Sequence, residues 1–332
     1  MFEKAIQLIT DAQKIVVIQA ENPDGDSLGS ALALEELLGD AGKDVTLYCA
    51  IDIPKYMHYI RGWDRVTNDW PADADLAIIV DTSSQLLIAK ALEKPGVRHF
   101  LETHPVLILD HHQDVASDMP FEHTIVNDEV AVATGESIYK LAKEASWKIN
   151  ERAAEYMFIS IQADSLGLST PGTTVESYRI AAELVGLGAN PSEIEQRRRE
   201  YMKKPADILA YKGELIGRIE YLLDNKLALI HLTWDDIEEY SDRYNPSILV
   251  LDEMRLVEGV QVAIAIKTYP DGKLTGKLRT NAPVANQIAG FFGGGGHEHS
   301  AGFKVYEEYD KIITELVTAT DKALTDYESA IS

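Results

Sequence analysis

Short apolar runs alternate with amphipathic segments along the first part of the chain. Each run has the length of a strand and ends near a polar cluster, a pattern typical of strands covered on both faces. A helical pattern follows the first run, beginning near Asp26 and ending near Gly42. The alternation predicts a mostly parallel sheet with helices on both faces. The predicted strands are 14–20, 44–50, 75–81 and 106–110, and longer helices are predicted at 131–148, 150–163 and 174–188.

The composition changes near residue 189, where a polar and charged stretch predicts a helical linker. Beyond it, two apolar runs joined by a Pro-Asp-Gly turn predict a hairpin. We expect an α/β protein with a smaller C-terminal α/β domain that has a mixed sheet, and a cleft between the two domains. The predicted domains are 1–188 and 211–332 with the linker at 189–210; the later elements are strands at 226–232, 260–269, 273–280 and 300–305 and helices at 284–292 and from about 307.

The charge balance limits the choice of ligand. The chain has 332 residues, with 31 Lys plus Arg against 54 Asp plus Glu and a net charge of −23. Long nucleic acid is held by many cationic contacts to successive phosphates, and a strongly acidic surface repels it. Any nucleotide substrate is therefore expected to be short, with local cations supplying the attraction.

The sequence predicts a cytoplasmic protein that does not interact with a membrane. No apolar stretch approaches the length of a membrane span, and Met-Phe-Glu-Lys does not begin a secretory signal. The single cysteine, Cys49, cannot form an internal disulfide, which fits a reducing compartment. The oligomeric state is not determined by these features, and a homodimer is compatible with them.

Two carboxylates, Asp24 and Asp26, lie in the loop where the first predicted strand gives way to a helix. Ligand sites of open parallel sheets lie at the carboxyl ends of the strands, so this pair is well placed to hold a cation. The alternative is structural, because Asp26 or Ser27 could cap the helix and Pro-Asp-Gly is ordinary turn chemistry.

Further candidate ligands end other apolar segments. Asp81 ends one strand, the Asp110-His111-His112 run ends another, and Asp164 follows an apolar helix. Each could be an ordinary loop residue, but carboxylates together with imidazoles suit Mn, Fe, Co or Zn.

Three of these four polar clusters end strands of the same predicted sheet, so their side chains are expected to converge on one edge. Such convergence favours a metal site over independent helix-capping or loop roles. Two cations about 3.5–4 Å apart can generate hydroxide and neutralise a phosphoryl group. Asp81 is the candidate bridge, and His112 is expected to face the substrate phosphate. The predicted metal ligands are Asp24, Asp26, Asp81, His111 and Asp164, and the predicted catalytic residues are Asp110 and His112.

These motifs resemble the DHH phosphoesterase superfamily, and most of all its two-domain bacterial nanoRNases or oligoribonucleases. The likeness rests on PDGDSLGS, Asp81, Asp110-His111-His112, Asp164 and a late glycine run before His297. It implies two Mn²⁺ ions, one held by Asp24 and Asp81 and the other by Asp26, Asp81, His111 and Asp164. It also implies a C-terminal DHH-associated domain that binds the nucleotide, through Arg279 and the loop formed by Gly293, Gly294, Gly295, Gly296 and His297.

Residues of the glycine run fit this role on physical grounds, because backbone amides without side chains can approach an anion closely. Flexibility alone is the alternative explanation of such a run. A Walker A loop is excluded, since no Lys-Ser or Lys-Thr follows. Glu298, after His297, departs from the family pattern and is expected to face solvent.

Ala20 is the more informative departure. The family motif reads His-x-x-Pro-Asp-x-Asp, and the position of its metal-binding histidine is Ala20 here. The first metal would keep only Asp24 and Asp81 unless Glu21, another side chain or water substitutes. The alanine could belong to a working enzyme with a weak first metal, to a degenerate nucleotide binder, or to an engineered change.

The leading hypothesis is a metal-dependent phosphodiesterase that degrades short oligonucleotides to mononucleotides and also acts as a phosphatase on 3′-phosphoadenosine 5′-phosphate. A phosphodiesterase acting on cyclic dinucleotides or their linear products is the second hypothesis. An inorganic pyrophosphatase fits less well, because Arg279 and the glycine run suit a larger ligand. A nucleotide-binding protein with a weakened first metal site is the alternative from a different class.

Overall fold

The computed structural model describes the chain except for residues 113–116, 242–243 and 332. It forms two compact units, Met1–Lys203 and Lys204–Ser332. The division falls inside the stretch predicted as a linker, between helices α8 (Pro191–Tyr201) and α9 (Ala206–Gly217). Within the described residues, no helix is both long and apolar enough to cross a bilayer.

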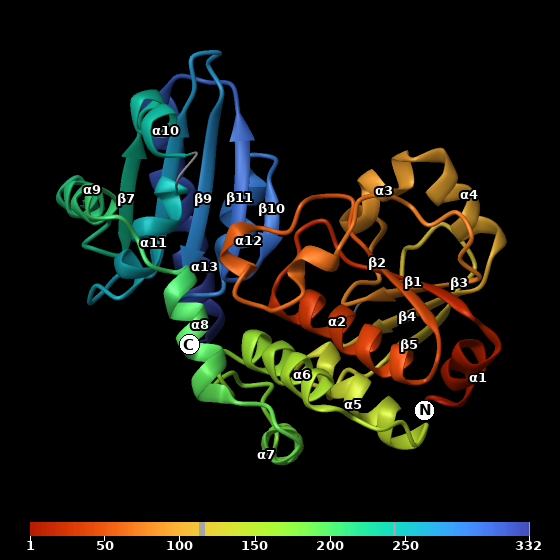
Figure 1. The fold of residues 1–332 in the computed structure, drawn as a ribbon. Coiled ribbons are helices and arrows are strands. Elements are labelled where there is room, and N and C mark those ends of the chain that lie inside the picture. Colours follow the sequence, from red (N-terminus) through yellow and green to blue (C-terminus); the bar gives the residue numbers. More distant parts are fainter. Residues whose placement is uncertain (113–116, 242–243, 332) are drawn as a thin grey trace. The chain divides into compact units, whose positions relative to one another are not determined.

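The first unit is built on a five-stranded parallel sheet with the order β2-β1-β3-β4-β5 (Figure 1). The expected parallel sheet is confirmed. Its strands are β1 (Lys14–Ile18), β2 (Asp44–Tyr48), β3 (Leu76–Val80), β4 (Val106–Asp110) and β5 (Thr124–Asn127). The other elements of this unit are α1 (Glu3–Asp11), α2 (Gly25–Asp40), α3 (Ala89–Glu93), α4 (Pro95–Thr103), α5 (Thr134–Glu144), α6 (Glu151–Asp164) and α7 (Val175–Gly186), with short 3₁₀ turns at Lys55–Met57, Trp63–Arg65 and Gln85–Ile88.

Both faces of this sheet are buried, as the apolar runs predict. Successive side chains of a strand point to opposite faces, so Val17 packs with α2, α5 and α6 while Val16 packs with α3 and α4. Helices therefore cover the sheet on both sides, which explains why the strands read as continuous apolar runs.

The strand order places a topological switch between β1 and β3. The chain leaves β1 toward β2 on one side and later continues through β3, β4 and β5 on the other. In open parallel sheets a ligand binds outside the carboxyl ends of the strands at such a switch point. The loops after β1, β3 and β4 are therefore the expected position of a site.

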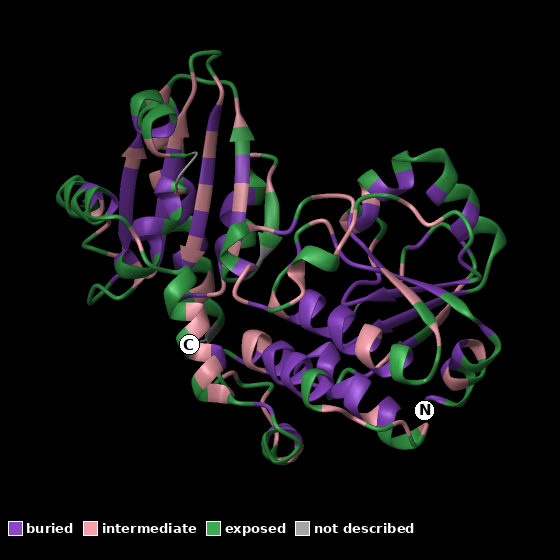
Figure 2. Cartoon of the chain, in the orientation of Figure 1, coloured by how far each residue is buried: buried purple, intermediate pink, exposed green. Residues whose placement is uncertain are grey.

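Helices α2 and α6 pack closely, and both are buried for most of their length (Figure 2). Glycine allows this approach: a Cβ at Gly29 would lie 2.7 Å from the carbonyl oxygen of Tyr156, and one at Gly25 would lie 2.6 Å from the Cβ of Ala163. The contact brings the C-terminal end of α6 beside the N-terminal end of α2.

The second unit contains a mixed six-stranded sheet with the order β10-β11-β9-β8-β7-β6 (Figure 1). Strands β7 and β8 are parallel, and the other neighbouring pairs are antiparallel. The predicted hairpin is present as β8 and β9. The remaining elements are β6 (Glu220–Leu222), β7 (Leu227–Leu232), α10 (Trp234–Tyr240), α11 (Pro246–Arg255), β8 (Val262–Thr268), β9 (Leu274–Thr280), α12 (Ala285–Phe291), β10 (Gly295–His297), β11 (Ser300–Val305) and α13 (Tyr309–Ile331).

Each face of this sheet also has its own apolar core. Ile264 and Leu278 pack with α12 and α13, whereas Ala263 and Ala265 pack with α9 and α11. The glycine run differs from expectation, because Gly295 and Gly296 belong to strand β10 and not to a loop. Strand β5 and helices α10 and α11 were not among the predicted elements.

Candidate metal centre

Neighbouring strand ends of the first unit carry the candidate ligands. Asp26 lies in the first turn of α2, after β1 and its loop. Asp81 comes directly after β3, and Asp110 is the last residue of β4, followed by His111. Because β1, β3 and β4 are adjacent and parallel, their carboxyl ends lie along one edge of the sheet.

The Nε2 atom of His111 lies at the centre of the cluster. It is 3.3 Å from Oδ2 of Asp26 and 3.5 Å from Oδ1 of Asp81. Asp164, at the end of α6, places Oδ2 3.2 Å from the same nitrogen. Among the described residues, two groups have ligand atoms close enough to hold a metal ion: Asp26, His111 and Asp164, and Asp81, His111 and His112.

The environment of this nitrogen suits a cation better than a hydrogen bond. Nε2 of His111 is buried and, in the described part of the chain, has no hydrogen-bond partner of good geometry, although three carboxylates surround it. The opposite ring atom, Nδ1, lies 3.3 Å from the carbonyl oxygen of Ala131. A bond from Nδ1–H to this carbonyl would leave the Nε2 lone pair directed toward the carboxylates, as in a metal-bound histidine.

Asp26 is fully buried and held by three polar groups that sequence analysis missed. Its Oδ1 accepts hydrogen bonds from the hydroxyls of Ser30 at 2.9 Å and Ser160 at 2.6 Å. Its Oδ2 accepts one from the backbone N–H of Thr134 at 2.8 Å. Ser30 follows Asp26 by one helical turn and Ser160 precedes Asp164 by one turn, so the i,i+4 spacing was the available signal.

Asp81 has a left-handed backbone conformation, with φ of +61°. Such a conformation is uncommon for a residue with a side chain, and strained residues of this kind cluster at functional sites. The hydroxyl of Thr134 donates to Oδ1 of Asp81 at 3.4 Å, so Thr134 contacts both Asp26 and Asp81.

Crowding of buried carboxylates shifts the pKa values of the cluster. Burial, followed by the charge of Asp26, raises the pKa of Asp81 well above its ordinary range. Burial and Asp26 also raise the pKa of Asp24 to about 6. Burial alone would lower the pKa of His111, but Asp164, Asp81 and Asp26 raise it to about 11. The group thus carries an excess of negative charge that a proton on His111 only partly neutralises and that a divalent cation would neutralise better.

Asp110 contacts the two histidines and does not belong to either metal-binding group. Its Oδ1 accepts from the ring Nδ1 of His112 at 2.7 Å and from the backbone N–H of His111 at 2.8 Å. Burial would raise the pKa of Asp110, but the bond from His112 lowers it to about 2. Asp110 is therefore a charged partner that fixes the orientation of His112.

Asp24 acts as the N-cap of α2. Its Oδ1 accepts from the backbone N–H groups of Asp26 and Ser27, both at 3.0 Å. Asp24 is outside both groups of potential ligands among the described residues. The sequence suggested Asp26 or Ser27 as the alternative cap, whereas the structure has Asp24 in that position. Ala20 is buried, and the Glu21 side chain accepts a hydrogen bond from the backbone of Ala91.

Arg279 and the glycine run lie on neighbouring strands of the second unit. Arg279, on β9, pairs with Ser300 of β11 and donates to its hydroxyl. A Cβ at Gly294 would lie 2.2 Å from the carbonyl oxygen of Gly302, and Gly296 has φ of +143°. These two glycines therefore permit close packing of the run against β11. Glu298 is exposed as expected, and the side chain of His297 lies outside the described structure.

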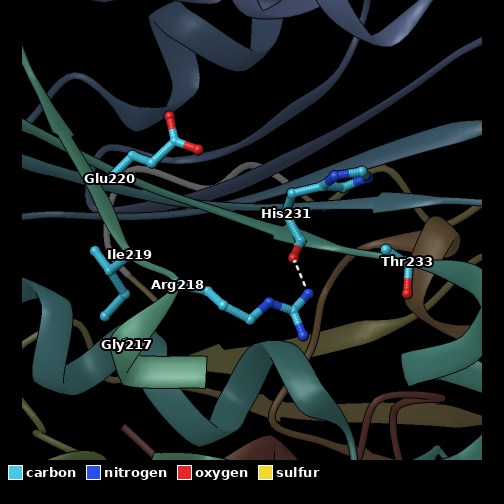
Figure 3. A pocket seen from close by; sticks show the side chains of 6 residues that line it. All are labelled: Gly217, Arg218, Ile219, Glu220, His231 and Thr233. Atoms are coloured by element: carbon cyan, nitrogen blue, oxygen red, sulfur yellow. Dashed lines mark hydrogen bonds between the residues drawn. The ribbon is translucent and has the colours of Figure 1, made fainter. Parts of the chain in front are cut away.

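A cavity of about 620 Å³ also lies in the second unit (Figure 3). The Arg218 guanidinium in its lining donates to the carbonyl oxygen of His231 at 2.6 Å and is paired with Asp236. This cation is already neutralised, so the cavity has no free charge from Arg218 to offer a phosphate. Its lining consists of Gly217, Arg218, Ile219, Glu220, His231 and Thr233.

The fold and the cluster define a class: an α/β protein with an Asp/His group that could hold a metal ion, at the switch point of a parallel sheet. Residues 14–161 match the DHH family, N-terminal domain, and the chain carries a domain of this family. The resemblance stated from the sequence motifs is thereby confirmed.

Relatives match over nearly the whole chain. The bifunctional oligoribonuclease and PAP phosphatase NrnA of Bacillus subtilis is 24% identical over 323 residues, covering 96% of this chain and 98% of the relative. NrnA of Thermus thermophilus is 25% identical, covering 85% of this chain and 81% of the relative. The crystal structure of an exopolyphosphatase-related protein from Bacteroides fragilis has the same fold, with a TM-score of 0.83, 20% identity and coverage of 99% and 96%.

Proposed function

We propose that this protein is a cytoplasmic, Mn²⁺-dependent phosphoesterase that degrades short oligonucleotides to mononucleotides and dephosphorylates 3′-phosphoadenosine 5′-phosphate. The observation that carries the proposal is the approach of Asp26, Asp81 and Asp164 to within 3.5 Å of Nε2 of His111. Supporting it, a relative named oligoribonuclease and PAP phosphatase is similar along its whole length. The net charge of −23 favours short substrates over long nucleic acid.

In this proposal, Asp26, Asp81, His111 and Asp164 hold one metal ion, while Asp24 and Asp81 hold the second more weakly. Bound metal would supply Lewis acidity toward the phosphoryl group and activate water near neutral pH. Carboxylate and imidazole ligands of this kind suit Mn²⁺. Ser30, Ser160 and Thr134 fix Asp26 before any ligand binds, so the carboxylate is already oriented.

His112 is the candidate group for contact with the substrate phosphate. Its ring is about half exposed, whereas Asp110 behind it is buried. The hydrogen bond from Nδ1 to Asp110 favours the protonated imidazole and raises the pKa of His112. A protonated Nε2 would donate to a phosphoryl oxygen and stabilise the charge that develops during hydrolysis.

Residues 1–188 are the proposed catalytic part, and residues 211–332 are the proposed substrate-binding part. Within the latter, Arg279 is half-buried and has one recorded hydroxyl partner, Ser300. A planar guanidinium suits bidentate binding of a phosphate. Backbone N–H groups of the glycine run would add neutral donors.

Hydrolysis of a dinucleotide by purified protein tests this function. With Mn²⁺, the wild-type chain should release mononucleotides, and chelation should stop the reaction. Asp81→Ala should abolish turnover because it removes a carboxylate shared by both proposed metals. Asp75→Ala is a matched control, since Asp75 is exposed, precedes β3 at the end opposite Asp81, and belongs to neither group of potential ligands. No cleavage at any Mn²⁺ concentration would reject the proposal.

A further inference from the structure

Glu136 is a fully buried carboxylate in the first turn of α5, and among the described residues it belongs to neither group of potential metal ligands. Its Oε2 accepts a hydrogen bond from the backbone N–H of Val132 at 3.4 Å. A glutamate at the third position of a helix commonly bonds the N–H of the N-cap residue, which is Ala133 here. Glu136 instead reaches the residue before the cap, so ordinary capping does not account for this contact.

The peptide group between Ala131 and Val132 is held at both ends. Its N–H donates to Glu136, and its carbonyl oxygen lies 3.3 Å from Nδ1 of His111. The N–H and C=O of a trans peptide point in opposite directions, so one planar unit joins the carboxylate to the imidazole. A negative charge on the N–H polarises the peptide group, which makes its carbonyl oxygen a stronger acceptor for the Nδ1–H of His111.

The segment that Glu136 holds also contacts the other candidate ligands. Two residues after Val132, Thr134 donates its backbone N–H to Asp26 at 2.8 Å. The hydroxyl of Thr134 donates to Asp81 at 3.4 Å. The position of this one short segment therefore affects two carboxylates of the cluster as well as its central histidine.

The charge of Glu136 is only partly compensated by its surroundings. Burial raises the pKa of Glu136, and the hydroxyl of Ser177 and the charge of Lys140 oppose this rise only in part. Lys140 also pairs with the buried Asp128 at 2.7 Å. The Oε1 atom of Glu136 is buried and has no hydrogen-bond partner of good geometry in the described part of the chain. A neutral acceptor would stabilise the fold better than a carboxylate in this position, so stability alone does not explain Glu136.

We propose that Glu136 is a positioning residue of the metal centre. Through the peptide group between Ala131 and Val132, its carboxylate holds a proton on Nδ1 of His111 and thereby keeps Nε2 free to bind the metal ion. It acts as the carboxylate partner of a metal-bound histidine does, with one peptide group inserted between the two side chains. The proposal rests on the proposed function, because it concerns the metal site of the same enzyme.

Mn²⁺ affinity of Glu136→Gln, measured by electron paramagnetic resonance of the free ion, tests this role. Glutamine keeps the size of the side chain and can still accept the N–H of Val132, but it removes the charge. The affinity should fall about 10-fold, as for other partners of metal-bound histidines. In a His111→Gln background, Glu136→Gln should change the affinity by less than ~2-fold, since its effect passes through His111. An equally large loss in that background, or an unchanged affinity in Glu136→Gln alone, would overturn the proposal.

Glu155→Gln is the matched control, because Glu155 is another buried carboxylate of the first unit and pairs with Arg197. It should bind Mn²⁺ as the wild-type protein does. Thermal unfolding of each variant separates positioning from stability. A loss of stability in Glu136→Gln without a loss of Mn²⁺ affinity would make Glu136 a structural residue only and overturn the proposal.

A second readout needs no metal. In metal-free protein with isotope-labelled histidine, nuclear magnetic resonance detects the Nδ1–H proton of His111, which is assigned by its absence in His111→Gln. This resonance should move upfield in Glu136→Gln because the hydrogen bond to the carbonyl of Ala131 weakens. An unshifted resonance would contradict the proposal. If the wild-type protein binds no Mn²⁺, the proposed function fails, and this resonance decides the role of Glu136 separately.

Glu136→Asp replaces Glu136→Gln if the glutamine variant does not fold. The shorter side chain keeps the charge but withdraws from the N–H of Val132. The same fall in Mn²⁺ affinity and the same dependence on His111 are then expected, and wild-type affinity in Glu136→Asp would overturn the proposal.

Discussion

The ring Nδ1 of His112 lies 2.7 Å from Oδ1 of Asp110, and this carboxylate oxygen also accepts the backbone N–H of His111. One buried aspartate at the end of β4 thus fixes two consecutive histidines with different environments. His111 lies 3.2–3.5 Å from three other carboxylates, whereas His112 is about half exposed. The Asp-His-His run therefore combines the proposed metal ligand His111, the exposed candidate for substrate contact His112, and Asp110, which hydrogen-bonds to both.

Asp110→Asn should lower kcat by about 10- to 100-fold, as expected when the partner of a functional histidine is removed. The amide can still accept the backbone hydrogen bonds, so the fold and Mn²⁺ affinity should change little. Steady-state kinetics on a dinucleotide, combined with Mn²⁺ calorimetry, measures both effects. His112→Asn provides the second arm of a double-mutant cycle. Additive losses in the double variant would contradict a role of Asp110 through His112.

Ser160→Ala should weaken Mn²⁺ binding by about 10-fold because Asp26 loses a hydroxyl donor. It should also destabilise the first unit by about 1–3 kcal/mol, since the backbone N–H of Gly135 loses its acceptor. Ser30→Ala is the matched variant: it removes the other donor to the same oxygen without affecting Gly135. Mn²⁺ titration and urea unfolding separate the effects. Equal stability losses in the two variants would contradict the assigned role of Gly135.

Particular residues show how far the sequence could predict this structure. Asp26, Asp81 and His111 were predictable as neighbours because parallel strands end at one edge, and the apolar runs mark those strands clearly. Ser160 was not singled out, since a serine inside an apolar helix gives no sign of its partner until α2 and α6 are packed. Strand β5 has four residues, and only Val126 is buried, so its apolar pattern is too short to recognise.

In the second unit, the glycine run and Lys277 show what the sequence could not predict. Four consecutive glycines predict freedom of the backbone, but they do not reveal that Gly294 and Gly296 are needed for close packing against β11. Lys277 appears in the sequence as one of many lysines. Its position beside Arg279 and opposite Gly302 became visible only in the register of the strands. Long-range pairing of this kind is not encoded in local periodicity.

Asp236→Asn should destabilise the second unit at neutral pH and much less in acid. Asp236 accepts from Arg218 at 2.7 Å and from Tyr211 at 2.9 Å, and although burial would raise its pKa, these bonds hold it well below the ordinary value. A lowered folded-state pKa gives stability that is present above the unfolded pKa of about 4 and is lost as pH falls below it.

The loss at pH 7 should be about 2 kcal/mol, since charge-assisted hydrogen bonds are exchanged for neutral ones while Arg218 remains partly solvated. Urea unfolding at pH 7 and pH 3 measures the change. Asp235→Asn, at the neighbouring exposed position, is the control. A destabilisation of Asp236→Asn that is larger at pH 3 than at pH 7 would contradict the assigned direction.

Ala20→His should restore an imidazole at the end of β1 and raise Mn²⁺ affinity at the weaker proposed site by about 10-fold or more. Ala20→Gln introduces a side chain of similar size without an imidazole and controls for steric effects at this buried position. Calorimetry and dinucleotide hydrolysis are the readouts. Unchanged affinity and unchanged activity in Ala20→His would mean that another group already supplies the missing ligand.

The most direct test of the metal centre is a titration of the wild-type protein and of His111→Gln with Mn²⁺ in the absence of substrate. Electron paramagnetic resonance measures the concentration of free Mn²⁺ at each step. His111 joins both potential ligand groups, so its replacement should weaken the tighter Mn²⁺ site by about 10-fold or more. His104→Gln, at an exposed histidine of the same unit, should bind as wild type. Tight binding by wild type that is lost only in His111→Gln is the predicted result; equal binding by all three proteins would contradict the assignment.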